Sequence, residues 1–223
     1  MSDRSDKDAE LELGAPRGWY SRGYVPHFDN YHALQFITFR LADSLPQSKL
    51  EQLEQELRRD NLPQSKKDVE KRKSIELWLD AGYGCCALSH PAVANIVQGA
   101  LLKFDGRRYL LISWCIMPNH VHVLIDPRES LSKIVQSWKS YTGRWALRKN
   151  AELELGVPGG KFWMRDYWDR FIRDQRHFEQ AIDYIHRNPV KTGLCSGPGE
   201  WQWSSAWARR APARQQLQQE KTP

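Results

Sequence analysis

The segment between Arg108 and Ile125 most restricts how this chain can fold. Two apolar runs, 108–116 and 120–125, are separated by the three residues Met-Pro-Asn. Runs of this length and composition are typical of strands, and a short break between them is typical of a turn joining antiparallel neighbours. We therefore predict a β-hairpin in the middle of the chain, and a sheet against which the other elements must pack.

Other segments have the spacing of further strands and helices. Ala33–Leu41 is rich in β-branched and aromatic residues and predicts a strand, and Tyr167–Arg173 predicts a fourth one. Apolar residues at helical spacing predict helices over 48–59, 67–79, 92–104, 131–148 and from Asp174, a good N-cap, to Pro189, which should end the helix. This order favours an α+β fold: a ferredoxin-like βαββαβ split sandwich, with helices on one face of an antiparallel sheet and an added helical insert.

The ends of the chain differ in composition from its middle. Residues 1–18 are polar, and we expect a disordered N-terminal arm there. Residues 208–223 are rich in Arg, Gln and Ala and predict a basic flexible tail. The folded domain is expected over 19–207, with the helical insert at 47–80 carrying charges on most of its exposed positions.

Composition excludes several classes of protein. Hydrophobic residues make up 40% of the 223 residues, which is enough for a sizeable core and excludes global disorder. No apolar run approaches the roughly 18 residues of a membrane span, and the first dozen residues hold no apolar signal segment. We therefore expect a cytoplasmic protein with no membrane association. The four cysteines form no C-x-x-C motif, and we expect all of them to be reduced.

The chain is moderately basic, with 33 Lys and Arg against 27 Asp and Glu, a formal net charge of +6 and a pI near 9.2. Trp and Tyr are interleaved with these cations over 133–149 and 161–191. Cations that hold phosphates, beside flat rings that stack on bases, are features of single-stranded nucleic-acid binding. A solvated helical face over a Trp-rich core would show the same pattern, so this signal is weak on its own.

The sequence NHVHVL at 119–124 is the most informative short motif. Residues two apart on a strand point to the same face, about 6.5–7 Å from each other. His120 and His122 can therefore direct two imidazoles at one point while Val121 and Val123 face the core. Such a pair is a bidentate site for a divalent transition ion, with a third ligand supplied from elsewhere in the chain. Two surface histidines on a half-buried strand are the alternative.

The last predicted helix can place two polar side chains along one edge. Its apolar stripe is formed by Phe178, Ile182 and Ile185. At about 100° per residue, Asn188 lies about 40° from Tyr184 and one turn further along the helix. This edge can present a phenol and an amide oxygen together. Because Asn188 precedes Pro189, we expect its side chain to be displaced from the ideal face.

Three separated motifs, in this order, resemble one known family. MPNHVHVLI at 117–125, WDRFIRD at 168–174 and DYIHRNPVKTGL at 183–194, with a basic helix between the first two, are similar to motifs of the HUH single-tyrosine transposases. Within that superfamily the chain resembles the REP-associated tyrosine transposases, whose N-terminal region is similar to RGYVPHFDN and QFITFRLADSLP of this sequence. The resemblance extends over roughly residues 19–207.

This resemblance implies a function and a site. It implies a metal-dependent single-stranded DNA endonuclease and strand transferase that acts on palindromic repeat hairpins. The metal-binding histidines would be His120 and His122, the nucleophile Tyr184 and the third ligand Asn188, where related insertion-sequence enzymes often have Gln. Mg²⁺ or Mn²⁺ is the implied cofactor. Attack of the phenolate on phosphorus would leave a covalent 5′-phosphotyrosine and a free 3′-hydroxyl.

Several residues are candidates for contact with single-stranded or hairpin DNA. Cations on the basic helix and around the motifs can hold phosphates; they are Lys139, Arg144, Arg148, Arg165, Arg170, Arg173 and Lys191. In the similar family the substrate is a short hairpin with a tetranucleotide flank, and Arg22, Tyr24 and His27 are candidates for reading its bases. A solvated surface position is the alternative for each of these residues.

Other interpretations of the sequence stay open at this point. Tyr141 on the basic helix is a rival nucleophile. A domesticated sequence-specific DNA-binding protein would keep the same residues without turnover. A small-molecule metalloenzyme of the cupin type also has H-x-H on a strand, but it requires an all-β chain, which the helical periodicity of 131–148 and 174–187 contradicts. The sequence is compatible with both a monomer and a homodimer.

Overall fold

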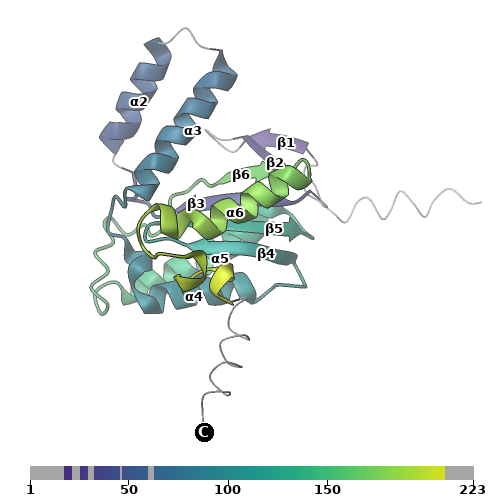
Figure 1. The fold of residues 1–223 in the computed structure, drawn as a ribbon. Coiled ribbons are helices and arrows are strands. Elements are labelled where there is room, and N and C mark those ends of the chain that lie inside the picture. The colour runs from purple at the N-terminus through teal and green to yellow at the C-terminus, as the bar shows by residue number, and fades with distance from the viewer. Residues whose placement is uncertain (1–17, 22–25, 30–32, 46, 60–62, 209–223) are drawn as a thin grey trace, which may run out of the picture.

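A four-stranded antiparallel sheet organises the chain (Figure 1). The computed structural model describes residues 18–21, 26–29, 33–45, 47–59 and 63–208, so the predicted terminal arm and tail lie almost wholly outside the described residues. The strands are β3 (Gln35–Arg40), β4 (Tyr109–Ile116), β5 (His120–Pro127) and β6 (Trp168–Phe171), in the order β4-β5-β3-β6. The hairpin predicted between 108 and 125 is β4–β5, and all three strand pairings are antiparallel.

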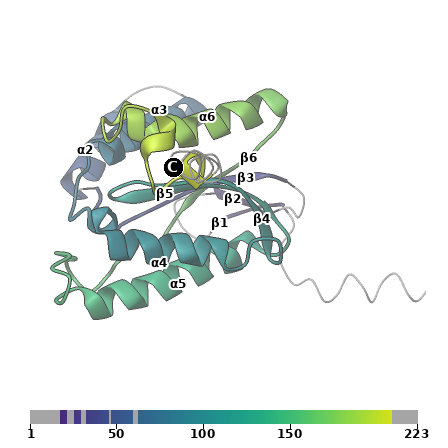
Figure 2. The same ribbon diagram turned by 60° about the horizontal axis from the view of Figure 1, so that its bottom comes forward.

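Two helices cover one face of this sheet, as predicted. α4 (Pro91–Leu102) lies between β3 and β4 in the chain, after the helical insert, and α5 (Leu131–Lys149) connects β5 to β6. Figure 2 shows both helices side by side beneath the sheet. Strand order, pairing direction and connections together give the ferredoxin-like βαββαβ arrangement that the sequence predicts.

The expectation that the helices share one face is wrong for the last helix. α6 (Gln175–Lys191) lies on the opposite face of the sheet, where it packs against β4 and β5 (Figure 2). The physical reason is that both faces of the sheet carry side chains that are buried. On β5, Val121, Val123 and Ile125 face α4 and α5, whereas Leu124 packs with the buried α6 residue Ile185. A sheet with two buried faces needs a helical layer on each.

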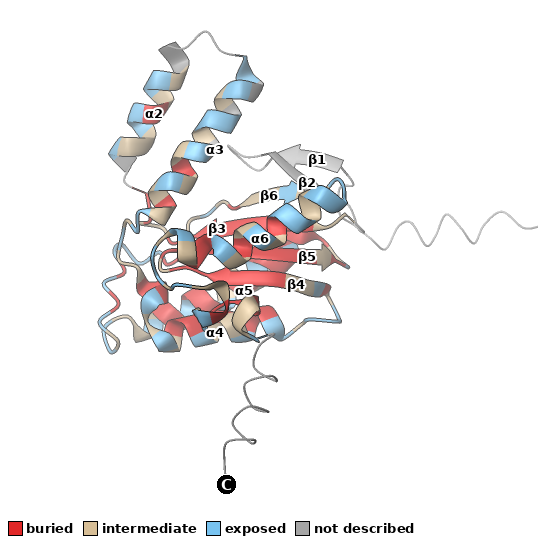
Figure 3. Ribbon diagram, in the orientation of Figure 1, coloured by how far each residue is buried: buried red, intermediate tan, exposed pale blue. Residues whose placement is uncertain are grey.

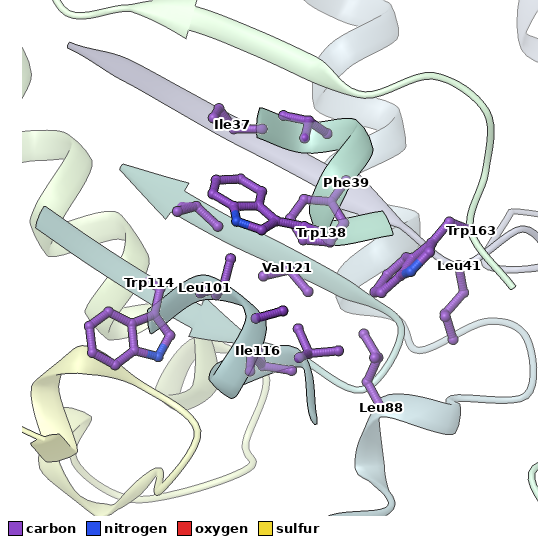
Figure 4. Close-up of a cluster of buried hydrophobic side chains, with 14 of the residues drawn as sticks. Ile37, Phe39, Leu41, Leu88, Leu101, Trp114, Ile116, Val121, Trp138 and Trp163 are labelled. Atoms are coloured by element: carbon purple, nitrogen blue, oxygen red, sulfur yellow. The ribbon is translucent and has the colours of Figure 1, made fainter. Parts of the chain in front are cut away.

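The larger core lies between the sheet and the α4–α5 layer (Figure 4). Phe39 of β3 has its ring centroid 4.9 Å from that of Trp163 and 6.1 Å from that of Trp138 on α5. Tyr167 is also buried in this cluster. All four cysteines have free thiols, and none of the helices in the described part of the chain is long and apolar enough to span a membrane.

The ends of α6 test two predictions made from sequence. Asp174 caps the helix as predicted, because its carboxylate accepts a hydrogen bond of 2.7 Å from the His177 amide. Pro189 does not end the helix, which continues to Lys191. Near a C-terminus the ring removes only one helical hydrogen bond, and its fixed φ suits the helix. The chain turns instead at Gly193, whose φ of +74° belongs to the left-handed region favoured by glycine.

The helical insert is a hairpin of α2 (Gln47–Arg59) and α3 (Gln64–Asp80). Much of it projects from the sheet and is exposed, but the C-terminal end of α3 is buried (Figure 3). Ile75 and Leu79 are buried there with Leu45, and Trp168 of β6 packs against them. A further hairpin of β1 (Gly18–Ser21) and β2 (Pro26–Asp29), which the sequence did not predict, precedes the sheet. Short 3₁₀ turns at Ala87–Ser89 and Pro198–Glu200 complete the described elements.

Candidate active site

The two histidines of the NHVH motif converge on the α6 face of the sheet. Alternation along β5 puts His120 and His122 on one side of the strand, and both side chains are only 1% exposed. Their Nε2 atoms lie 3.0 Å apart. The pair is therefore buried beneath α6, and the alternative of two surface histidines is wrong.

A second set of side chains fixes the orientation of both imidazoles. His120 Nδ1 lies 2.7 Å from Asn119 Oδ1, and the Asn119 amide nitrogen donates to the carbonyl of Tyr83 at 3.0 Å. Because a carbonyl oxygen only accepts, Nδ1 of His120 must carry the proton, which leaves a lone pair on Nε2. His122 Nδ1 lies 2.8 Å from Thr38 Oγ1, a hydroxyl that can accept in the same way.

Burial keeps both imidazoles neutral. It lowers the pKa of His120 to about 3, with the Lys191 ammonium as a second cause. Burial is also the main cause that lowers the pKa of His122, and the charges of His120 and then Lys191 lower it further. A neutral imidazole with an unprotonated ring nitrogen is the form that binds a metal ion.

Tyr184 and Asn188 of α6 face this histidine pair. The Tyr184 ring centroid is 5.2 Å from that of His122, and Phe36 lies against both rings at 5.9 Å and 5.5 Å. Asn188 is 1% exposed, and its Nδ2 is 3.3 Å from His122 Nε2. The displacement of Asn188 expected from Pro189 does not occur, because the helix continues through both residues. The structure thus brings together all four residues of the predicted site.

The hydroxyl of Tyr184 is in an unusual environment. Its Oη is buried and, within the described residues, makes no hydrogen bond of standard geometry. Burial raises the pKa of the phenol above its ordinary value, and the carboxylates of Glu76 and Asp80 raise it further, whereas hydrogen bonding from the Asn188 side chain and the charge of Arg170 lower it. A buried polar group without a well-formed hydrogen bond is uncommon and often marks a functional position.

The residues present fit a divalent metal ion. Two ligands at right angles on an ion with bonds of about 2.1 Å lie about 3 Å apart, which is the separation of the two Nε2 atoms. Oδ1 of Asn188 is buried with no hydrogen-bond partner among the described residues. A half-turn of this amide would direct that oxygen at the histidines. No three His, Cys, Asp or Glu side chains in the described part of the chain cluster so as to hold a metal ion, and the Asn188 amide is placed to supply a third ligand here.

Of the residues predicted to contact DNA, two lie beside this site. Arg170 of β6 is paired with Phe36 of β3, and its guanidinium carbon is 5.5 Å from the Phe36 ring centroid. Lys191 lies at the end of α6 and forms an ion pair of 2.6 Å with Asp80. Both residues place a cation near the tyrosine and histidines, and their contact with DNA stays a prediction.

The other predicted DNA contacts lie away from it. Lys139, Arg144 and Arg165 line a groove of about 520 Å³ between α5 and residues 160–167, on the opposite face of the sheet. There Lys139 donates to the Arg165 carbonyl at 2.6 Å, and burial lowers its pKa to about 8. Arg148 is exposed further along α5, and Arg173 is exposed just before α6. Arg22 and Tyr24 lie outside the described residues, and for His27 only the backbone is described.

The rival nucleophile is not near the histidines. Tyr141 is 46% exposed on α5, the helix that covers the other face of the sheet, and its ring lies 5.9 Å from the Lys103 ammonium. Sequence reasoning missed the groups that support the site, Thr38, Asn119, Glu76 and Asp80. Only Asn119 had a sequence signal, because it directly precedes the histidine motif.

The chain thus combines a ferredoxin-like fold with a buried histidine pair and a tyrosine that faces it. The comparison with protein families agrees: residues 92–188 match the family described as "Transposase IS200 like". That segment contains both histidines, the tyrosine and Asn188, which are the residues that carry the resemblance noted in the sequence.

Individual relatives point to one subgroup. The REP-associated tyrosine transposase of Escherichia coli (strain K12) is 23% identical over 112 residues, which cover 50% of this chain and 63% of that protein. A Haemophilus influenzae protein given the same designation provisionally is 29% identical over 101 residues, covering 42% of this chain and 57% of its own. The chain thus matches about three fifths of the length of these relatives, and over that part it is similar to REP-associated tyrosine transposases.

A solved structure shows a similar chain. It is a REP-associated tyrosine transposase bound to a REP hairpin, with 18% sequence identity, a TM-score of 0.47 and coverage of 83% of this chain and 81% of that one.

Proposed function

We propose that this protein is a metal-dependent endonuclease and strand transferase that acts on single-stranded palindromic hairpins through Tyr184. The observation that carries the proposal is the meeting of three groups from two distant segments, β5 and α6: two Nε2 atoms 3.0 Å apart and a phenol ring 5.2 Å from one of the imidazoles. The relationship to tyrosine transposases supports the same conclusion.

Each residue has a defined part in the reaction. The Tyr184 oxygen attacks phosphorus in line, the bond to the 3′-oxygen breaks, and the DNA is left with a 3′-hydroxyl and a 5′-phosphotyrosine. The same bond energy then permits rejoining to another 3′-hydroxyl. His120, His122 and Asn188 would hold Mg²⁺ or Mn²⁺, which supplies polarisation of a non-bridging phosphate oxygen when bound. Asn119 and Thr38 keep the imidazoles in the orientation this requires.

The low reactivity of the free phenol fits a reaction confined to bound DNA. An ordinary tyrosine with a pKa of about 10 is ionised in roughly one molecule in a thousand at pH 7, and burial raises the pKa of Tyr184 further. Ionisation of the Tyr184 phenol therefore requires positive charge close to its oxygen when the DNA is bound. Arg170 is the cation that already lowers the pKa of this phenol.

A covalent-adduct assay tests the proposal. The probe is a pool of single-stranded oligonucleotides with one palindromic stem and a randomised four-nucleotide flank, incubated with Mn²⁺ or with EDTA and run on a denaturing gel. With a 3′-label, the label should migrate with the protein, and with a 5′-label it should appear only in a shortened free fragment. Tyr184→Phe should form no adduct, while Tyr141→Phe should form as much as the wild type. DNA binding without any adduct in the wild type would instead support a DNA-binding protein without turnover.

A further inference from the structure

The inserted hairpin reaches the active site through the last turns of α3. Ile75 and Leu79 anchor this end of the helix in a small core with Trp168, on the same face of the sheet as α6. Figures 1 and 2 both show the C-terminal end of α3 next to the C-terminal end of α6. Glu76 and Asp80 are one turn apart, and Asp80 contacts α6 directly.

The contact between α3 and α6 is an ion pair in which the carboxylate is much more buried than the ammonium. Asp80 Oδ2 and Lys191 Nζ lie 2.6 Å apart, and the side chains are 11% and 52% exposed. The second carboxylate oxygen, Oδ1 of Asp80, is buried and has no hydrogen-bond partner among the described residues. By contrast, the Arg187–Asp183 pair on α6 is 70% and 65% exposed, as is usual for a solvated surface pair. Because Asp80 is largely buried and its Oδ2 is paired with the Lys191 ammonium, Asp80 restricts where this ammonium can lie.

The position of Lys191 gives this contact a consequence for the site. Lys191 follows Asn188 by one turn of α6, and its charge acts on both His120 and His122. Its ammonium carries three N–H donors, one of which is directed to Asp80, and half of the side chain remains accessible. It is thus a cation with free donors at the edge of the histidine–tyrosine site.

We propose that Asp80 is a positioning residue that holds the Lys191 ammonium where it binds a non-bridging oxygen of the phosphodiester to be cut. The helical insert is then a working part of the active site. This inference rests on the proposed function. Lysine is well suited to such a contact, because a compact ammonium can share its donors between a carboxylate and a phosphate.

A double-mutant cycle tests this proposal against a purely structural contact. Lys191→Met should slow single-turnover adduct formation about tenfold to a hundredfold, as expected for loss of a hydrogen bond to a charged group. Asp80→Asn should slow it about threefold to tenfold in the wild type and have no further effect in the Lys191→Met protein. Lys191→Arg and Asp80→Glu should each restore most of the rate. The salt dependence of hairpin binding should become shallower in Lys191→Met, because one phosphate contact is lost.

The control is Asp183→Asn, which breaks the exposed ion pair on the same helix and should leave the rate unchanged. Thermal unfolding of every variant identifies any that fail to fold. If Lys191→Met or Asp80→Asn fails to fold, the rates of Lys191→Arg and Asp80→Glu test the proposal instead. Equal effects of Asp80→Asn with and without Lys191 would overturn the proposal, as would an unchanged rate in Lys191→Met. Absence of an adduct in the wild type would instead contradict the proposed function, so the two failures are distinct.

Discussion

Replacing Tyr184 by phenylalanine is expected to stabilise the protein while abolishing its attachment to DNA. In the folded protein Oη is buried, and the Asn188 side chain near it makes no hydrogen bond of standard geometry, whereas in the unfolded chain the hydroxyl is solvated. A buried donor left unsatisfied costs about 1–3 kcal/mol. The phenyl ring would keep its contacts with Phe36 and His122. The free energy of unfolding should therefore rise by about 1–2 kcal/mol, or about 2–8 °C in Tm for a domain of this size.

Urea unfolding followed by tryptophan fluorescence measures this change. Metal-free buffer is required, because an ion that binds only the folded protein would add its own stabilisation. Tyr141→Phe is the matched control: its side chain is 46% exposed, so its stability should stay within about 0.5 kcal/mol of the wild type. A Tyr184→Phe protein that is less stable than the wild type, or equally stable, would show that the hydroxyl is hydrogen-bonded and that the description of this site is wrong.

Three further predictions concern the metal, the phosphates and the groove. His120→Ala or His122→Ala should abolish adduct formation, as should EDTA with the wild type, and full activity under any of these conditions would exclude a metal-dependent reaction. Hairpin affinity should fall steeply with salt, with a slope shallower by about 0.7–1 in Arg170→Ala; an identical slope in both proteins would remove Arg170 from the phosphate contacts. Because burial lowers the pKa of Lys139 to about 8, the unfolded chain binds more protons between pH 8 and about 10.5, and stability should rise with pH across that window. In Lys139→Met, the urea midpoint should rise less between pH 8 and about 10.5 than it does in the wild type. Parallel plots of midpoint against pH for the two proteins would contradict the lowered pKa of Lys139.

Local patterns in the sequence were sufficient to predict most of the elements. The β4–β5 hairpin, the cap at Asp174 and the periodicity of α5 depend on neighbours within a few residues, so they can be identified in a single chain. The prediction that α6 ends at Pro189 is wrong, because the last turn of a helix tolerates proline, whereas Gly193 can adopt the left-handed conformation that ends it. The β1–β2 hairpin was missed because its strands are only four residues long.

Local sequence likewise predicts one part of the candidate site and not the rest. The spacing of His120 and His122 determines that both imidazoles leave one face of a strand, and the helical angle between Tyr184 and Asn188 determines that they share an edge. These relations are properties of the local backbone and hold wherever the elements are placed. The supporting contacts of Thr38 and Asp80 join segments 84 and 111 residues apart, to His122 and Lys191 respectively, and no local rule predicts them.

Only the tertiary structure decided which face of the sheet each helix covers. The basic helix α5 and the tyrosine helix α6 are both amphipathic, and amphipathicity specifies that a helix is buried on one side without specifying the surface that buries it. Packing placed α6 over the histidines and left Lys139, Arg144 and Arg165 on the far side. The sequence by itself therefore determined which chemical groups the chain carries and how neighbouring ones are oriented. Which of them meet depended on burial of both sheet faces, a property of the whole fold.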